Sequence, residues 1–322
     1  MLELEDQWIW DFWITQDHDR LWHCYFLKAD KSLGDPNKRH FNVSQGHATS
    51  VDLVNWNHLG TTWKPSAQES FDDYTTWTGS VMFDNDQWHY FYTGTSKKDK
   101  GMLQRIGHAS GNDLHNWKKV NDGLALDLDP TIYEEFRPEF WHDRALRDPW
   151  VMRHPVDTNS FLMAYTARVP RSQEANDCGA IGLAISQDLN KWKAIKPLFE
   201  GGFGQLEVPQ IFKWKDKWYC TFCVAPEHWS INYKNNYQGH IAAGTHYLMA
   251  DNFEGPWEIA PGPFFTSFSP SELYAGRFII NQDQLLFMAF YHDDPRGNFI
   301  GKVSDPFSVE VEKNGILKLV LE

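Results

Sequence analysis

A short cassette recurs along the chain and constrains its fold more than any other sequence feature. Three copies read Asp-Leu-x-x-Trp and begin at Asp52, Asp113 and Asp188, and two degraded copies follow at Asp251 and Asp305. In each copy we expect the Asp to cap a turn between two strands and the Trp to pack between neighbouring repeats. The chain is therefore expected to be built from five similar units.

Two further strands are expected upstream of each cassette. An aromatic strand opened by a polar turn comes just before it, as in Asp86–Tyr92 and Asp216–Phe222. The first strands of the units are expected at Trp8–Trp13, Trp77–Phe83, Asp148–Arg153, Glu207–Phe212 and Ser271–Ile280. Three strands plus a short edge strand, repeated five times, are typical of a β-propeller.

We therefore predict an all-β fold, a five-bladed β-propeller that forms a single domain over residues 1–322. Either Met1–Glu5 or Ile316–Leu321 is expected to supply the strand that closes the ring. No long amphipathic helix is expected, and the only helical candidate is a turn or two around Pro130–Phe136.

The charge balance narrows the range of partners. The chain has 30 Lys and Arg against 43 Asp and Glu, a formal net charge of −13. Such a surface repels phosphate backbones, so we expect no nucleic acid and no acidic membrane as a partner. No apolar run approaches the roughly 20 residues of a membrane span. Because the N-terminus Met-Leu-Glu-Leu-Glu-Asp lacks the pattern of a secretion signal, we expect a cytoplasmic protein, with an exposed flank open to homo-oligomer formation.

The four cysteines do not form a disulfide or zinc pattern. Cys220 and Cys223 have Cys-x-x-Cys spacing, but they lie in an aromatic segment that reads as a strand, where residues three apart point to opposite faces. We expect all four to pack in the core, and the histidines show no metal-ligand spacing. The sequence predicts no catalytic metal and no cofactor.

Acidic residues recur on the predicted first strands, beside apolar and aromatic neighbours. They are Asp11, Asp148 and Glu207, with Glu272 on the fifth strand. A single Asp at a strand end is usually a turn or cap residue, but first strands of a propeller surround its axis, so these acids are expected to converge. Converging carboxylates push their pKa values apart, which provides the acid and base of glycoside hydrolysis. The aromatic residues around them suit stacking on a sugar, so a small carbohydrate is the expected partner.

Several motifs resemble those of a known enzyme clan. The stretch Gly46-His47-Ala48 to Trp56 is close to a glycoside hydrolase family 32 signature, and Trp77-Thr-Gly-Ser80 resembles Trp-Ser-Gly-Ser. Arg147-Asp148-Pro149 matches Arg-Asp-Pro, Glu207-Val-Pro209 resembles Glu-Cys-Pro, and Leu273-Tyr274-Ala275 is similar to Asp-x-Tyr-Ala. The chain thus resembles the five-bladed glycosidases of families 32 and 68, the invertases, levanases and levansucrases.

This resemblance implies a role for each matching residue. Asp11 matches the nucleophile, Glu207 the general acid/base, and Asp148 the carboxylate that stabilises the transition state. Substrate-binding positions are expected at Trp10, Trp13, Trp77, Ser80, Arg147 and Glu272. The implied activity is cleavage of β-fructofuranosides such as sucrose or short fructo-oligosaccharides, with retention of configuration through a fructosyl-enzyme. The Asp11 and Glu207 carboxyls would then lie roughly 5–5.5 Å apart.

The chain also departs from the family 32 pattern. Trp-Asp-Phe-Trp surrounds Asp11, as in family 68, and Glu272 stands where an Asp is expected. We expect no C-terminal β-sandwich, because about ten residues follow the fifth repeat. Three alternatives stay open: a fructosyltransferase that uses the same residues, an inverting arabinanase-like glycosidase with carboxyls more than about 6.5 Å apart, and an inactive carbohydrate-binding propeller.

Overall fold

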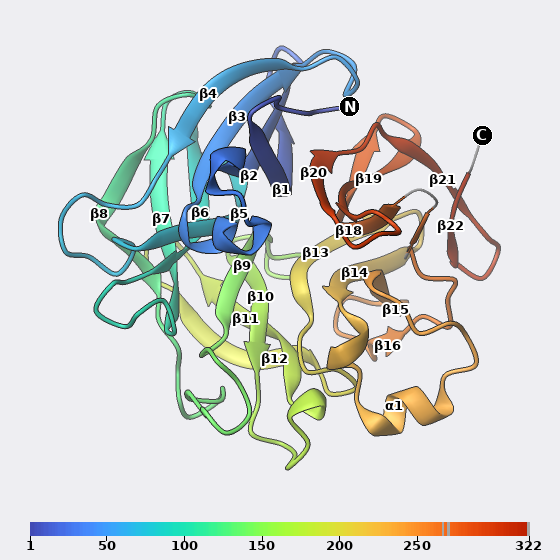
Figure 1. The fold of residues 1–322 in the computed structure, drawn as a ribbon. Helices are drawn as coiled ribbons and strands as arrows, with labels where there is room; N and C mark the ends of the chain where they lie inside the picture. The colour runs from blue at the N-terminus through green and yellow to red at the C-terminus, as the bar shows by residue number, and fades with distance from the viewer. Residues whose placement is uncertain (266, 269–270, 321–322) are drawn as a thin grey trace.

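Five antiparallel sheets are arranged in a ring in the computed structural model, which describes residues 1–265, 267–268 and 271–320 (Figure 1). The predicted five-bladed β-propeller is thereby confirmed. The first blade contains β1 (Gln7–Gln16), β2 (Trp22–Asp30), β3 (Ser44–Ser50) and β4 (Asn57–Trp63). The second contains β5 (Thr75–Asp84), β6 (Gln87–Thr95), β7 (Gln104–Gly111) and β8 (Lys118–Leu126).

The other three blades repeat this order with one variation. The third contains β9 (Leu146–Arg153), β10 (Phe161–Arg168), β11 (Gly179–Ser186) and β12 (Lys193–Glu200). The fourth contains β13 (Glu207–Trp214), β14 (Lys217–Val224), β15 (Gly244–Ala250) and β16 (Glu258–Ile259). The fifth contains β17 (Ser267–Phe268), β18 (Ser271–Asn281), β19 (Gln284–Asp293), β20 (Phe299–Val303), β21 (Phe307–Val311) and β22 (Leu317–Leu319). In this last blade β20 and β21 both pair with β19.

In the described ranges, helical structure is confined to short segments of the connections. They are the α-helix α1 (Ile231–Asn236) and the 3-10 helices η1 (Lys31–Leu33), η2 (Pro36–Phe41), η3 (Ala175–Asp177) and η4 (Pro226–His228). The segment 130–136, the predicted helical candidate, contains turns and no helix. Among the described residues, no helix has the length and apolar character needed to cross a membrane.

Both ends of the chain complete the fifth blade. The backbone of Leu2 bonds that of Val303 in β20, with N···O distances of 3.1 and 2.9 Å. At the other end, β22 pairs with β21. Met1–Glu5 and Ile316–Leu321, which were predicted as alternatives, thus both contribute to the fifth blade. Leu321 itself lies outside the described residues.

The repeated cassettes have the structure that the sequence predicts. The Asp52 carboxylate accepts hydrogen bonds from the backbone N–H groups of Val54 and Asn55, at 2.9 and 2.8 Å. The third-blade Trp192 packs edge-on against Phe91 of the second blade, with ring centroids 5.7 Å apart. All four cysteines are unpaired and buried, which confirms that they pack in the core.

Two blades contain a buried histidine pair at the same position. His23 of β2 lies 2.9 Å from His47 of β3, and His89 of β6 lies 2.9 Å from His108 of β7, measured from Nδ1 to Nε2. Burial lowers the pKa of His47 and of His108 to about 3. Each pair is therefore neutral in the folded protein at neutral pH.

These pairs predict that stability decreases in mild acid. A histidine whose pKa is lowered by folding contributes stability above its ordinary pKa of 6.5, and this contribution is lost as the pH falls toward 3. For His108 the loss at about pH 5 is on the order of 2 kcal/mol. Thermal unfolding of the wild type and of His108→Gln between about pH 5 and 7.5 should show a shallower pH dependence in the variant. Parallel curves would contradict the expectation.

A β-bulge interrupts the inner strand pairing of every blade at a similar depth. The register shifts at Trp10/Phe12 in β1 and at Trp77/Gly79 in β5. The corresponding shifts occur opposite Asp148 in the third blade, after Glu207 in β13, and after Tyr274 in β18. The backbone takes positive φ at Asp11 (35°), Asp148 (59°), Val208 (53°) and Ala275 (47°). Because a bulge redirects the side chains next to it, these breaks turn the side chains of Asp11, Asp148 and Glu207 toward one another.

The bulge of the second blade depends on a glycine. A Cβ at Gly79 would lie 2.0 Å from the carbonyl oxygen of Phe91 on the paired strand. No side chain fits there without moving the backbone, so this position requires glycine.

Candidate active site

The bulges bring Asp11, Asp148 and Glu207 into one cluster, in which Asp148 is buried and the other two acids are partly exposed, although they lie in three different blades. The three carboxylates are close enough for the charges of Asp148 and Glu207 to act on Asp11. Arg147 joins two of them: its Nε lies 3.4 Å from Asp148 Oδ2, and its Nη2 lies 2.6 Å from Glu207 Oε1. Acids separated by about 200 positions therefore share a single electrostatic environment.

Hydrogen bonds fix the two aspartates. The Thr78 hydroxyl donates to Asp11 Oδ2 at 2.5 Å. Asp148 Oδ2 accepts from the Thr166 hydroxyl at 2.9 Å and from the backbone N–H of Val208 at 3.2 Å. Each carboxylate is thus held by a residue from a neighbouring strand or blade, which limits its rotation.

Arg147 is itself held by a buried polar network. Its Nη1 donates to Gln104 Oε1 and to Asp143 Oδ2, both at 3.3 Å, and its Nη2 donates to Gln205 Oε1. Gln205 in turn contacts His228 of η4, with 3.1 Å between their side-chain nitrogens. The guanidinium is therefore oriented from several sides and keeps its charge next to Glu207.

The environment of Glu207 favours its ionised form. Burial alone would raise the pKa of Glu207, but the adjacent Arg147 guanidinium and a hydrogen bond from Tyr274 outweigh burial and lower it. The Tyr274 hydroxyl donates to Glu207 Oε2 at 2.6 Å.

The environment of Asp11 has the opposite effect. Burial, followed by the negative charge of Asp148, raises the pKa of Asp11 to about 7, against the hydrogen bond from Thr78 and the charge of Arg277. Burial also raises the pKa of Asp148, although Arg147 opposes it. A single proton shared by Asp11 and Glu207 near neutral pH therefore resides mainly on Asp11.

The connection between β2 and β3 covers one side of the cluster. It carries η2, where the carbonyl of His40 accepts a hydrogen bond from the indole of Trp77 at 2.8 Å. The Arg39 guanidinium lies 4.0 Å from the ring centroid of Phe299 and 5.6 Å from that of Trp10. Trp77 is partly exposed here, whereas Trp10 is 3% exposed and lies beneath the loop.

Two predicted substrate-binding residues lie in the wall of the ring instead. Trp13 is 1% exposed and packs against Tyr25 and Tyr90, with centroids 6.1 and 5.9 Å apart. Ser80 is 2% exposed, and its hydroxyl accepts a hydrogen bond from the Val151 N–H at 3.2 Å, which links the second and third blades. Both residues follow the bulges, where side chains turn into the interface between blades, and their role in substrate binding stays a prediction from the sequence.

The fifth-blade acid Glu272 lies half-buried among other carboxylates. Burial, then the charges of Asp293 in β19 and of Glu227 in η4, raise its pKa. The charged groups that act on Glu272 therefore lie in the fourth and fifth blades.

Several contributors to the cluster were not predicted as site residues. Thr78 and Tyr274 lie inside motifs that the sequence displays, so their proximity to an acid could have been inferred. Thr166, Gln205 and Arg277 match no motif, and only the fold reveals them. Within the described part of the chain, no group of three metal-ligating side chains is arranged to hold an ion.

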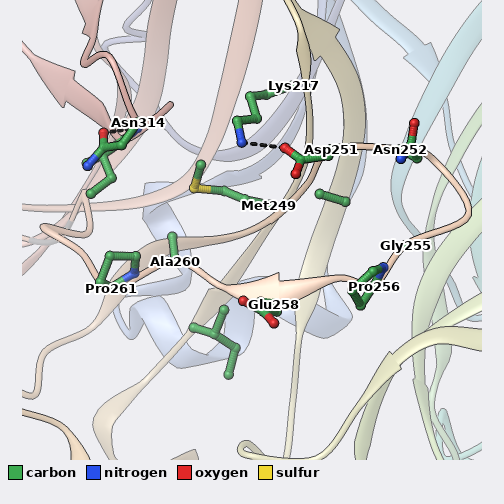
Figure 2. Close-up of a pocket in the computed structure, with 13 residues that line it drawn as sticks. Lys217, Met249, Asp251, Asn252, Gly255, Pro256, Glu258, Ala260, Pro261 and Asn314 are labelled. Carbon is green, nitrogen blue, oxygen red and sulfur yellow. Dashed lines mark hydrogen bonds and ion pairs between the residues drawn. The ribbon is translucent and has the colours of Figure 1, made fainter.

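A separate pocket of about 420 Å³ lies on the outer side of the fourth blade (Figure 2). Lys217 and Asp251, which both line the pocket, form an ion pair. Met249 also lines it, together with β16 and the β21–β22 turn at Asn314. None of the clustered acids lines this pocket, so it is not the candidate active site.

Comparison with known proteins identifies the class that this fold and this cluster define. Residues 5–292 match the glycosyl hydrolases family 32 N-terminal domain. Since this match covers most of the chain, the protein belongs to glycosyl hydrolase family 32.

Two curated relatives are similar in sequence. An invertase from Wickerhamomyces anomalus is 25% identical over 293 residues, which cover 88% of this chain and 46% of that protein. A sucrose-6-phosphate hydrolase from Bacillus subtilis (strain 168) is 26% identical over 209 residues, which cover 62% of this chain and 39% of that protein. The chain thus spans less than half the length of these relatives.

Solved structures share the fold at lower identity. An inulosucrase from Halalkalicoccus jeotgali bound to kestose is 19% identical with a TM-score of 0.80, and the alignment covers 99% of this chain and 90% of that one. The levansucrase of Bacillus subtilis is 16% identical with a TM-score of 0.75, covering 98% and 86%. These likenesses establish the propeller fold.

Proposed function

We propose that the chain is a retaining glycoside hydrolase that cleaves β-fructofuranosides such as sucrose or short fructo-oligosaccharides. The observation that carries this proposal is the meeting of Asp11, Asp148 and Glu207 around Arg147, in a chain that belongs to family 32. The curated relatives, an invertase and a sucrose-6-phosphate hydrolase by name, support this substrate class.

In the proposed reaction the Asp11 carboxylate attacks the anomeric carbon of the fructosyl unit. The bond from this carbon to the leaving oxygen breaks, and Glu207 gives that oxygen its proton. Water then attacks the fructosyl ester, transfers a proton to Glu207, and releases Asp11 as a carboxylate. Asp148, held by Thr166 and Val208, accepts hydrogen bonds from the sugar hydroxyls as positive charge develops on the ring.

The protonation state limits how much of the enzyme is active. The reaction needs an ionised Asp11 and a protonated Glu207, whereas the single proton resides mainly on Asp11. The active arrangement is then a minor fraction of the singly protonated enzyme. Activity should fall above about pH 7, because the last shared proton is lost there.

Tyr274→Phe tests the assignment of Glu207 as the acid. Without this hydrogen bond the pKa of Glu207 should rise, so the acidic limb of the kcat/KM profile should move up by about one pH unit. The control is Tyr291→Phe, a half-buried fifth-blade tyrosine near Lys302, which should leave the limb in place. An unshifted limb in Tyr274→Phe would argue against Glu207 as the proton donor.

Incubation with sucrose and with 1-kestose, followed by quantification of all released sugars, tests the function. A hydrolase should release fructose and glucose from sucrose in equal amounts. Glucose in excess of fructose, with growth of longer oligosaccharides, would instead identify a fructosyltransferase that uses the same residues. Release of arabinose from an arabinoside, or binding without turnover, would contradict the proposal.

A further inference from the structure

A buried arginine that forms no ion pair with a carboxylate in the described part of the chain lies beneath the acid cluster. Arg277 of β18 is 2% exposed, and its guanidinium donates to backbone carbonyls of two other blades. Its Nε donates to Phe12 O at 3.2 Å, and its Nη1 donates to Val208 O at 3.3 Å and to Pro209 O at 3.0 Å. Its Nη2 is buried and has no hydrogen-bond partner among the residues that the structure describes. A buried guanidinium is costly, so this arrangement calls for a specific role.

The three carbonyls belong to the segments that present the catalytic acids. Phe12 directly follows Asp11, and Val208 and Pro209 directly follow Glu207. The N–H of Val208 also donates to Asp148, so the peptide groups on either side of this residue contact the arginine and the aspartate. Arg277 therefore ties together the bulges of the first and fourth blades.

The charge of Arg277 also acts on the acids. Burial lowers the pKa of Arg277 to about 10, against the negative charges of Asp148 and Asp11, so it stays protonated at neutral pH. Its effect on Asp11 opposes the burial and the repulsion that raise the pKa of this carboxyl.

We propose that Arg277 is a positioning residue that fixes the backbone beside Asp11 and Glu207 and supplies the positive charge that favours an ionised Asp11. The inference rests on the proposed function, because it assigns Asp11 a step that needs its ionised form.

The other charged groups around Asp11 do not replace this contribution. Among the described residues, the groups that act on Asp11 include Asp148, Glu207, Tyr274, Cys223, Arg39, Arg277 and the Thr78 hydroxyl. Arg277 and Arg39 are the cations in this set. Arg277 lowers the pKa of Asp11 and follows burial, Asp148, Thr78 and Glu207 in the size of its effect, whereas Arg39 is not among these five influences. Arg147 is directed at Asp148 and Glu207.

The pH dependence of kcat/KM for sucrose distinguishes a charge effect from a structural one. In Arg277→Met the pKa of Asp11 should rise by about one unit, so kcat/KM at about pH 6 should fall about tenfold and the alkaline limb should move up by one unit. At a pH above the alkaline limbs of both the wild type and the variant, most molecules have both carboxyls ionised, and the active fraction then depends on the pKa of Glu207 alone. The loss in kcat/KM should therefore disappear at about pH 9. Arg277→Lys should return the alkaline limb to its wild-type position, because it restores the positive charge.

The matched control is Arg144→Met, which removes another buried arginine, one paired with Asp127. It is expected to lower stability and leave both limbs in place. An Arg277→Met profile that falls by the same factor at every pH would mean a structural role only and would overturn the proposal.

A second measurement does not depend on activity. Thermal unfolding of the wild type, Arg277→Met, Asp11→Asn and the double variant forms a mutant cycle. At about pH 8, Arg277→Met should lower the midpoint by about 3 °C more in the Asp11 background than in the Asn background, and this difference should disappear near pH 5. If the difference is observed while no fructoside is cleaved, the proposed function fails and the charge relation stands. If it is absent at pH 8, the charge relation fails whatever the activity.

Discussion

Replacement of Asp11 by asparagine is expected to lower kcat for sucrose by at least about 10³-fold, because the amide cannot form the fructosyl ester. The measurement is fructose release under saturating sucrose. Asp188→Asn is the matched control, since Asp188 caps a surface turn through its bonds to Asn190 and Lys191. Near-normal turnover by Asp11→Asn would remove Asp11 from the mechanism.

The same substitution is expected to stabilise the fold at alkaline pH. Folding raises the pKa of Asp11 to about 7, so the stability associated with its neutral form is complete below its ordinary pKa of 3.8 and is lost as the pH rises through 7. Asparagine carries no charge at any pH, and the gain at about pH 8 should be on the order of 1–3 kcal/mol. Thermal unfolding at about pH 8 and pH 4 measures it, and an equal effect at both values would contradict the raised pKa of Asp11.

Replacement of Glu207 by glutamine is the second large effect. It should lower kcat/KM for sucrose by about 10²–10⁴-fold, because the leaving oxygen then receives no proton. A fructosyl fluoride should be affected much less in its first step, since fluoride leaves without protonation. Added azide should then replace water at the ester and yield β-fructosyl azide.

The control for this variant is Glu200→Gln, at the end of β12, which should cleave sucrose normally. Equal losses for sucrose and for the fluoride would show that Glu207 acts in some way other than proton donation.

The sequence predicts the propeller because the features that repeat are local. A capping Asp such as Asp52 and a packed Trp such as Trp192 act within a few residues or on the adjacent blade. Their recurrence therefore reports both the turns and the number of blades. The predicted core positions of the cysteines follow from strand alternation for the same reason.

The details of the site depend on contacts that no local pattern contains. The bulges at Asp11 and Gly79 shift the alternation of side chains, so Trp13 and Ser80 turn into the wall of the ring. Arg277 contacts Phe12 from the opposite end of the chain, so its place beside Asp11 follows only from ring closure.

Several properties stay predictions from the sequence. They are the single domain over residues 1–322, the cytoplasmic location, the possible homo-oligomer and the separation of about 5–5.5 Å between the Asp11 and Glu207 carboxyls. Sedimentation of the purified chain tests the oligomer, and cell fractionation tests the location.

The stereochemistry of transfer to methanol tests the central claim most directly. Incubation of the wild type with sucrose and methanol should yield methyl β-D-fructofuranoside, because attack by Asp11 and then by methanol inverts the anomeric carbon twice. This product does not mutarotate, and NMR identifies its configuration. Methyl α-D-fructofuranoside, or no cleavage of sucrose at all, would contradict a double displacement at the cluster of Asp11, Asp148 and Glu207.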